Sequence, residues 1–383
     1  MAGGDGGNPD PAAIGMTIAS ASEANDAADI VTVLQRLGAR YDAAPLFPID
    51  SLHRLRAAGY HHRFAPPDAG GEPFAGSRSR YAAMLGALRQ VGRGDLSVGR
   101  LFEGHVNALL LFDWYGTAEQ RAWLASALRR GAWFGVWATE PTPGVRLEGD
   151  ASPVLSGAKT FASGAGGLDY AIVTAAVEGT DRRLAIVPAN DAGRADLSEW
   201  RVRGMRASQS GRYDVTGLPA DAAMLLGAAG DYDRDPRFTA GAWRFCAVQL
   251  GGIEALLGQI RQALQSRREA DGQARARFAD AVIAARTAGF WVREAAERAA
   301  NEDADAPAIA RLARGVVERS GFFVMEAAAR ILGTRSAFDG ELADKIARDL
   351  SLYLRQAGGD QMHDMAAQAF LDHDCWPLDD RLW

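Results

Sequence analysis

The feature that most constrains this chain is a change of hydrophobic periodicity that occurs twice. Before Gly131 and after Pro236, apolar residues recur every three or four positions, which is typical of helices that bury one face. Between these limits, from Phe134 to about Gly227, short apolar runs rich in β-branched and aromatic residues are separated by Gly, Asp, Pro and Asn. Such runs indicate strands and turns. We therefore predict a mainly α protein with a central β domain.

At 383 residues the chain is long enough for two or three domains. The predicted parts are a disordered tail (1–25), an N-terminal helical domain (26–131), a small β-barrel or sandwich domain (132–235) and a C-terminal four-helix bundle (236–383). The predicted strands are 133–139, 153–163, 169–177, 183–188, 199–205 and 212–216. The predicted bundle helices follow apolar seams over 246–264, 278–292, 309–323 and 342–353, and a last helix follows them.

Three local patterns give sharper predictions. The segment from Val98 to Trp114 is apolar nearly all round, so it predicts a buried helix. Thr117, with Gln120 three residues later, predicts a capping box at the start of the next helix. Asp360 is predicted to cap the N-terminus of the last helix.

Composition excludes several classes of function. The net charge of -6 gives no basic field, so no nucleic-acid partner is predicted. Two cysteines are too few for a disulfide framework or a metal cluster, and this usage fits a reducing, cytoplasmic location. No run of 18 apolar residues occurs, so no membrane span is expected. The start of the chain lacks the basic and apolar segments of a signal peptide.

Several strings follow one another in an informative order. They are Trp137-Ala-Thr-Glu-Pro141, Ser156-Gly-Ala-Lys-Thr-Phe-Ala-Ser-Gly164 with Asp169-Tyr-Ala, Gly204-Met-Arg-Ala-Ser-Gln-Ser-Gly211, and Arg330-Ile-Leu-Gly333 with Arg348-Asp349. In order and spacing they resemble segments of the acyl-CoA dehydrogenase family. No single string is specific, and the resemblance covers roughly residues 26–371. It implies helices, a small β domain and a helical bundle in that order.

The resemblance also implies an FAD cofactor and the residues that hold it. Backbone N–H groups over Trp137, Ala138 and Thr139, with the Thr139 hydroxyl, match residues that bind the pyrimidine edge of the flavin. Phe161, Ala162 and Ser163 match the segment that faces the flavin ring and its N5. Taken alone, each of these residues is better explained as strand packing with local hydrogen bonds, and their order and spacing together favour flavin contact. A homodimer or homotetramer and a small-molecule substrate, in the family an acyl-CoA, are further implications.

The chain departs from the family at the catalytic base. The family's dehydrogenases use a glutamate to remove the α-proton of the thioester, and such a base must lie within hydrogen-bond reach of that proton. The matching position here is about Ala357, and the alternative family position is near Ala242. Neither is a carboxylate, so the catalytic residues stay unassigned. Asp360, Glu254 and His105 are the remaining candidates for a base.

Other departures concern the phosphates and the histidines. Gly144-Val-Arg146 replaces the family's Gly-Ser-Asp, and Arg267 and Arg330 are the remaining candidates for a diphosphate contact. A solvated surface charge explains these arginines equally well. His105 is predicted to lie in the core or near the flavin, and no His, Cys or carboxylate spacing predicts a metal site.

Three functions therefore stay open. The first is an FAD-dependent oxidoreductase with an acyl-thioester-like substrate and an unconventional base, which comes first because dehydrogenation is the family's commonest activity. The second is a flavin-dependent monooxygenase on the same fold, which needs no such glutamate. The third is a non-catalytic homologue that keeps the fold.

Overall fold

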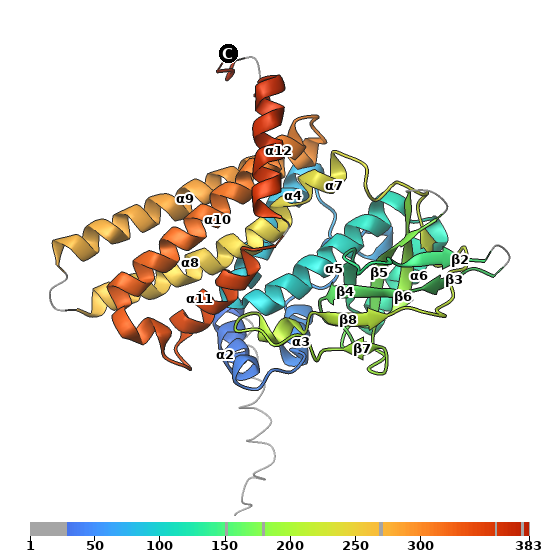
Figure 1. Ribbon diagram of the computed structural model, residues 1–383, viewed down its shortest axis with the longest axis horizontal. Helices are drawn as coiled ribbons and strands as arrows, with labels where there is room; N and C mark the ends of the chain where they lie inside the picture. Colours follow the sequence, from blue (N-terminus) through green and yellow to red (C-terminus); the bar gives the residue numbers. More distant parts are fainter. Residues whose placement is uncertain are drawn as a thin grey trace, which may run out of the picture.

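The computed structural model describes residues 29–149, 152–177, 181–267, 271–356, 358–376 and 379–382. A helical N-terminal part, two β-sheets and a group of long C-terminal helices pack together, and α5 (Leu96–Tyr115) contacts both the sheets and the long helices (Figure 1). The predicted fold class is therefore confirmed. The predicted tail over residues 1–25 lies outside the described residues.

Helices form the N-terminal part of the described chain. They are α2 (Ile30–Ala43), α3 (Ile49–Ala57), η1 (Pro67–Ala69), α4 (Ser77–Gly94), α5 and α6 (Ala118–Arg130). Helix α5 is buried along most of its length, and Asp95 caps it by accepting a hydrogen bond from the Val98 N–H at 2.8 Å. The predicted capping box is present at α6, where Thr117 and Gln120 each accept a hydrogen bond from the other's backbone N–H.

Two sheets form the central part. The larger has β1 (Phe134–Trp137), β2 (Arg146–Glu148), β3 (Val154–Ser156), β5 (Tyr170–Ala176), β6 (Arg182–Pro188) and β9 (Leu225–Leu226). Its strand β5 pairs antiparallel with β6 and parallel with β1, with Phe134 opposite Tyr170. The smaller sheet is the antiparallel series β4 (Ala158–Ala162), β8 (Gly211–Asp214) and β7 (Ala195–Asp196).

The strand predicted over 199–205 is wrong, because tertiary contacts impose a tight loop there. A Cβ on Gly204 would lie 2.1 Å from the Arg348 carbonyl oxygen, so the backbone approaches α11 (Leu342–Tyr353) closely. Met205 then takes a left-handed φ of 56°, and its carbonyl accepts a hydrogen bond from the Trp200 indole at 3.2 Å. The loop continues into η2 (Arg206–Ser208).

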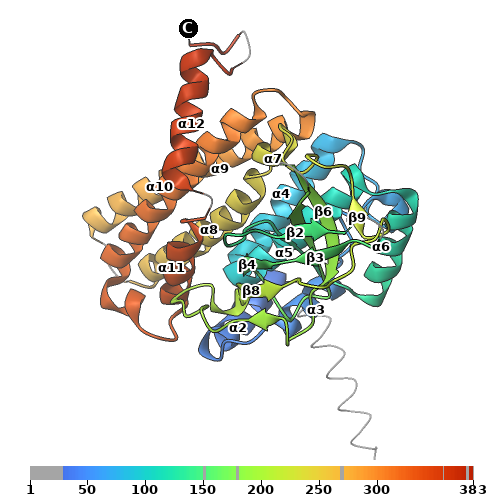
Figure 2. The same cartoon turned by 45° about the vertical axis from the view of Figure 1, so that its right-hand side comes forward.

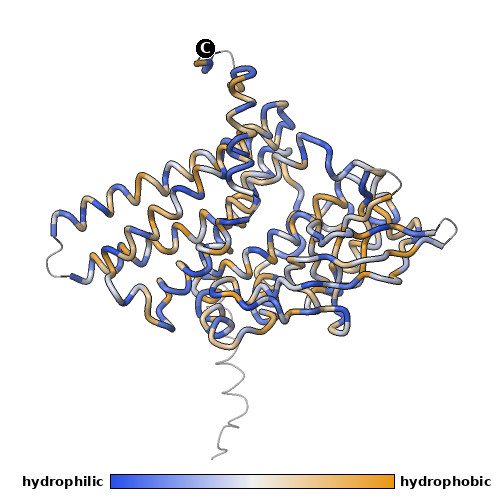
Figure 3. The backbone as a smooth tube through the Cα atoms, in the orientation of Figure 1, coloured by the Kyte–Doolittle hydropathy of each residue, from blue (hydrophilic) through white to orange (hydrophobic). Residues whose placement is uncertain are grey.

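The C-terminal part contains α7 (Arg237–Ala240), α8 (Trp243–Ser266), α9 (Gly272–Asn301), α10 (Ala306–Leu332), η3 (Gly333–Ala337), α11 and α12 (Gly359–Asp372). The bundle of α8, α9 and α10 takes a further long helix, α4, from the N-terminal part. Gly92 and Gly251 allow this approach, since a Cβ on either residue would lie 2.2 Å from a carbonyl oxygen of the facing helix. Polar and apolar positions alternate along these helices, as their amphipathic sequences require (Figure 3).

Helix α12 stands out from the body in both cartoon views (Figures 1 and 2), and Ala366 is its one buried residue among those described. Its N-cap is Gly358, and Asp360 is an exposed residue of its first turn. The prediction that Asp360 caps this helix is therefore wrong, because the helix begins one residue before it. Among the described helices, none has the length and hydropathy that crossing a bilayer requires.

A buried ionic cluster joins α5, α11 and the loop that leads into η2. The Lys345 ammonium on α11 donates to Asp95 at the start of α5 and to Asp349 on α11, both at 2.7 Å. Asp349 also accepts a hydrogen bond from the Met205 N–H of the docked loop. Burial alone would lower the pKa of Lys345, but the charges of Asp349 and Asp95 raise it above its ordinary value. The cluster therefore fixes the sheets against the bundle.

Candidate functional site

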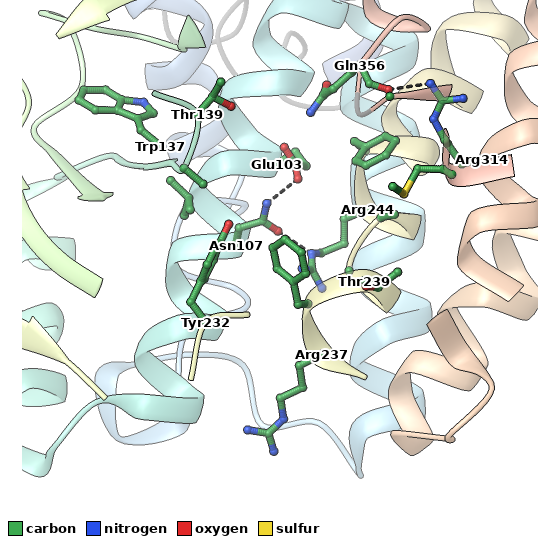
Figure 4. Close-up of a pocket in the computed structure, with 18 of the residues that line it drawn as sticks. Glu103, Asn107, Trp137, Thr139, Tyr232, Arg237, Thr239, Arg244, Arg314 and Gln356 are labelled. Carbon is green, nitrogen blue, oxygen red and sulfur yellow. Dashed lines mark hydrogen bonds between the residues drawn. The ribbon is translucent and has the colours of Figure 1, made fainter. Parts of the chain in front are cut away.

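A cavity of about 560 Å³ lies where the two sheets, α5, α7 and the N-terminal parts of α8, α10 and α12 meet. Its floor on the sheet side is the strand end at 136–139 with residues 160 and 161, and α5 supplies the facing polar wall. Figure 4 shows side chains from these separate elements converging on one space. A volume of this size suits a ring system or a small organic molecule.

The structure places four of the six predicted flavin-contacting residues on this cavity. Trp137, Ala138, Thr139 and Phe161 line it, whereas Ala162 and Ser163 are buried behind it. The Trp137 ring points into the sheet region, where its N–H donates to the Ser163 carbonyl at 3.0 Å, so this residue offers backbone atoms to the cavity (Figure 4). Thr139 is exposed, and its hydroxyl has no hydrogen-bond partner within the described chain.

Phe161 has an unusual backbone and an unusual exposure. Its φ is 51°, at a register shift in the β4–β8 pairing, and a bulky side chain in this region is strained. The ring is 65% exposed at the cavity, although aromatic rings are among the costliest side chains to leave in water. Strain of this kind is typical of functional sites, and an aromatic ligand laid against Phe161 would cover the exposed ring.

Ser163 belongs to a chain of hydroxyl groups that the sequence did not reveal. Its Oγ lies 2.9 Å from that of Ser210, which lies 2.9 Å from that of Ser208, and Ser208 donates to the Met205 carbonyl at 2.8 Å. These serines come from strands and loops that are adjacent only after folding. The chain fixes β4 against the loop that is docked on α11.

Next to the cavity floor, the buried Lys159 forms an ion pair with the partly exposed Glu140. Lys159 has no exposed surface, and its ammonium also donates to the Thr174 hydroxyl at 2.8 Å. Burial lowers the pKa of Lys159 to about 8, although its bond to Glu140 opposes this effect. Glu140 is therefore committed to holding the strand end, and it is not a free base.

The polar wall of the cavity is a row of side chains along α5, continued by α8. Arg100 pairs with Glu103, and Glu103 accepts a second hydrogen bond from the Asn107 amide. The amide oxygen of Asn107 accepts from Nε of Arg244 (Figure 4). Since the carboxylate can only accept and the guanidinium can only donate, the orientation of the Asn107 amide is determined. Spacings of three and four residues between polar side chains on an otherwise apolar helix were the sequence signal for this wall.

The candidate bases named from sequence lie outside productive reach. Glu254 is paired with Arg89 and Arg93, and neither it nor Asp360 lines the cavity. Ala242 lines the cavity but has no titratable group, and Ala357 lies outside the described residues. Glu103 is the one acidic side chain among the described lining residues, and both its oxygens are occupied.

His105 is a core residue and does not face the cavity. It stacks on His61 with ring centroids 5.0 Å apart, its Nδ1 accepts from the Phe134 N–H at 3.1 Å, and its Nε2 therefore donates to the His61 carbonyl at 2.7 Å. Burial lowers the pKa of both histidines, to about 4 for His61. Both rings are neutral at pH 7, and the described residues contain no cluster of His, Cys, Asp or Glu that could hold a metal ion.

The two arginines considered for a diphosphate have other partners. Arg267 donates to the Ile331 carbonyl at 2.6 Å, which completes the end of α10. Arg330 forms an exposed pair with Glu326 on the same helix, at 2.7 Å. Neither residue lines the cavity.

Comparison with known proteins gives the fold. No protein-family model matches the chain. It is 26% identical over 191 residues to the dibenzothiophene monooxygenase of Rhodococcus erythropolis, a match that covers 45% of this chain and 44% of that enzyme. The matched segment thus spans less than half the length of that relative.

Among solved structures, FMN-bound TdsC from Paenibacillus sp. A11-2 superposes with a TM-score of 0.80 at 18% identity, covering 92% of this chain and 97% of TdsC. Butyryl-CoA dehydrogenase from Megasphaera elsdenii superposes with a TM-score of 0.76 at 17% identity, covering 90% and 98%. The chain therefore has the acyl-CoA dehydrogenase fold, as its motifs predicted.

Proposed function

We propose that this chain is a flavin-dependent oxidoreductase that acts as a monooxygenase. The observation that carries this proposal is the state of Glu103. It is the one acidic side chain on the described cavity surface, and Arg100 and Asn107 occupy its two oxygens. Arg100 and Asn107 thus fix the orientation of this carboxylate within the polar wall, whereas removal of an α-proton requires a base that is held within hydrogen-bond reach of that proton.

The residues on the cavity floor are suited to a flavin. The unpartnered Thr139 hydroxyl can donate to the edge of the ring that gains negative charge on reduction. The exposed Phe161 ring can cover one face of an aromatic system and exclude water from it. When bound and reduced, a flavin supplies the two electrons needed to activate oxygen for insertion into a substrate.

The form of the flavin is a second part of the proposal. FAD follows from the resemblance, and the FMN bound to TdsC belongs to a protein of the same fold. Arg267 and Arg330, the candidates for a second phosphate, are held by Ile331 and Glu326. We propose FAD on the family resemblance, with its second phosphate held by groups other than these two arginines, and release of the flavin by denaturation followed by chromatography distinguishes FAD from FMN.

Acyl-CoA dehydrogenation stays as a second candidate, favoured by the superposition on butyryl-CoA dehydrogenase over 90% of this chain. It requires a base from outside the described cavity surface. A non-catalytic homologue is the third candidate, and Thr139 and Phe161 argue against it because both are left open toward the cavity.

The proposal is tested by supplying reduced flavin and oxygen to the purified protein with dibenzothiophene or indole as trial substrates. These compounds are chosen because they occur in the names of the relatives and their complexes. Isotopically labelled oxygen should enter an organic product when the protein is present. If the protein retains flavin but transfers labelled oxygen to no member of a wide panel of substrates, the monooxygenase assignment fails. If it neither retains nor binds flavin, the non-catalytic reading is favoured instead.

We also propose a homodimer or homotetramer built through the C-terminal helices. Large apolar side chains are exposed on α9 and α10, namely Ile283, Phe290, Phe322 and Phe323. An exposed apolar surface of this kind is typical of protein interfaces.

A further inference from the structure

We propose that the cavity takes an organic substrate with one anionic group, such as a carboxylate, and that Arg244 binds this group. The inference rests on the proposed function, because it assigns the substrate end of the same cavity.

The first support is the charge balance of the cavity. Five arginines and one acidic residue line it among the described residues. Three of the arginines have acidic partners, in the pairs Arg100–Glu103, Arg237–Glu302 and Arg314–Glu318. Arg244 and Arg311 form no ion pair with any residue that the structure describes. The cavity therefore carries positive charge that its own side chains do not compensate.

The second support is the burial of Arg244. This residue is 8% exposed, in a position where an uncompensated charge is costly. Burial lowers its pKa from the ordinary value, and the nearby charge of Glu103 opposes this only in part, since no carboxylate hydrogen-bonds to Arg244 within the described chain. An anion in the cavity would supply the hydrogen-bonded partner that this buried charge lacks.

The third support is the orientation of the guanidinium. Asn107 accepts from Nε, and the two terminal nitrogens of Arg244 have no hydrogen-bond partner among the described residues. Asn107 is itself held by Glu103, so the direction of the fork is fixed by the row along α5 (Figure 4). Two free, coplanar donors are suited to a carboxylate, which accepts two parallel hydrogen bonds.

The surroundings indicate the rest of the ligand. Aromatic side chains line the cavity near the arginine, namely Trp114, Tyr232, Phe238 and Phe245. Burial raises the pKa of Tyr232 to about 12, so its hydroxyl keeps its proton and can donate to a ligand. An aromatic or aliphatic body with one acidic end fits this wall. Arg311 is less buried than Arg244, so the anion is assigned to Arg244.

The test compares benzoate with benzamide, which has nearly the same shape and no charge. Calorimetry on the full-length protein as purified should show that benzoate binds on the order of 10- to 100-fold more tightly. Arg244→Met should remove this preference and leave benzamide binding within about twofold, since one charged hydrogen-bonded contact is lost. Arg244→Lys should give an intermediate preference, because it keeps the charge without the fork.

Several outcomes overturn the inference. Equal affinity of the natural protein for the two compounds would do so, as would a lack of benzoate binding up to about 10 mM. These results need no variant, so the test holds even if Arg244→Met does not fold. If Arg311→Met loses the preference for benzoate and Arg244→Met keeps it, the anion binds to Arg311 and the assignment to Arg244 is overturned.

A phosphate of the flavin is the other possible source of the anion. The variant is therefore also compared for riboflavin and FMN, which differ by one phosphate. If Arg244→Met weakens the binding of FMN and leaves the binding of riboflavin unchanged, Arg244 contacts the phosphate of the cofactor and the substrate assignment is overturned. Flavin absorbance reports the proposed function separately. If the protein prefers benzoate to benzamide but binds no flavin, the anion site stands and the proposed function fails. If it binds flavin but does not prefer benzoate, the proposed function stands and the anion site fails.

Discussion

Replacing Lys345 by Met should destabilise the protein far more than the loss of an exposed, paired charge. The side chains of Lys345, Asp95 and Asp349 are 10%, 2% and 1% exposed, and the ammonium lies 2.7 Å from both carboxylates. Removing it leaves two buried anions that face one another. Breaking a buried ion pair by removing one partner costs about 3–5 kcal/mol, and methionine keeps most of the volume.

Each carboxylate would retain one backbone donor, the Val98 N–H for Asp95 and the Met205 N–H for Asp349. These hydrogen bonds keep the cost from exceeding that range. They also locate the damage, because Asp349 would then repel Asp95 across the junction between α11, α5 and the docked loop. The loss should therefore include loosening of the sheets from the bundle.

The expected loss depends on pH with a definite sign. Burial already raises the folded-state pKa of Asp349, and in Lys345→Met this pKa should rise further, since the ammonium no longer opposes the effect of burial. A raised acid pKa gives stability at low pH that is lost as pH rises through the folded value. The variant should therefore lose less relative to the natural protein at pH 5 than at pH 8.

Urea unfolding followed by tryptophan fluorescence measures this difference. The matched control is Arg330→Met, which removes a cation whose pair is 55% and 59% exposed and should cost less than about 1 kcal/mol. A loss in Lys345→Met no larger than in the control would refute the reasoning. So would a loss that is the same at pH 5 and pH 8.

Thr139→Val should weaken flavin binding or shift the reduction potential of the bound flavin, in either case by a free energy on the order of 1–3 kcal/mol. The unfolding midpoint should not change, because the Thr139 hydroxyl has no partner in the described chain. An unchanged flavin content and an unchanged potential would show that Thr139 has only a structural role. Burial lowers the pKa of His61 to about 4, so its contribution to the free energy of unfolding should be fully present above about pH 6.5 and should fall by about 3 kcal/mol as the pH drops toward 4. His61→Gln should flatten this pH dependence. Identical pH profiles for the two proteins would contradict the prediction. Light scattering should give a dimer or tetramer at micromolar concentration, and Ile283→Glu with Phe290→Glu should reduce the mass, whereas a monomeric natural protein would exclude the proposed interface.

The parts of the fold that could be predicted from sequence depend on residues close together in the chain. The Thr117 capping box needs only Gln120, and burial of α5 follows from the apolar residues of that one segment. The order of the motifs led to the fold and to the strand end at 137–139. Such local consistency is expected of a sequence that specifies one structure.

The parts that could not be predicted depend on residues far apart in the chain. Arg244 meets Asn107 across 137 positions, and Lys345 meets Asp95 across 250. Addition of α4 to the bundle requires Gly92 and Gly251 to face the opposite backbone, and a glycine alone does not reveal what approaches it. The direction of the Trp137 ring could not be predicted either, because only the folded sheet shows on which face each side chain lies.

The central claim is that this fold here carries flavin chemistry without a base for α-proton removal. The most direct measurement is an anaerobic titration of the flavin-loaded protein with an excess of a short-chain acyl-CoA, followed by the long-wavelength flavin absorbance. Our account predicts that the absorbance stays, because Glu103 is held by Arg100 and Asn107 and the described cavity offers no other carboxylate. Rapid bleaching of the flavin by the acyl-CoA would contradict it and show that a base lies elsewhere in the chain.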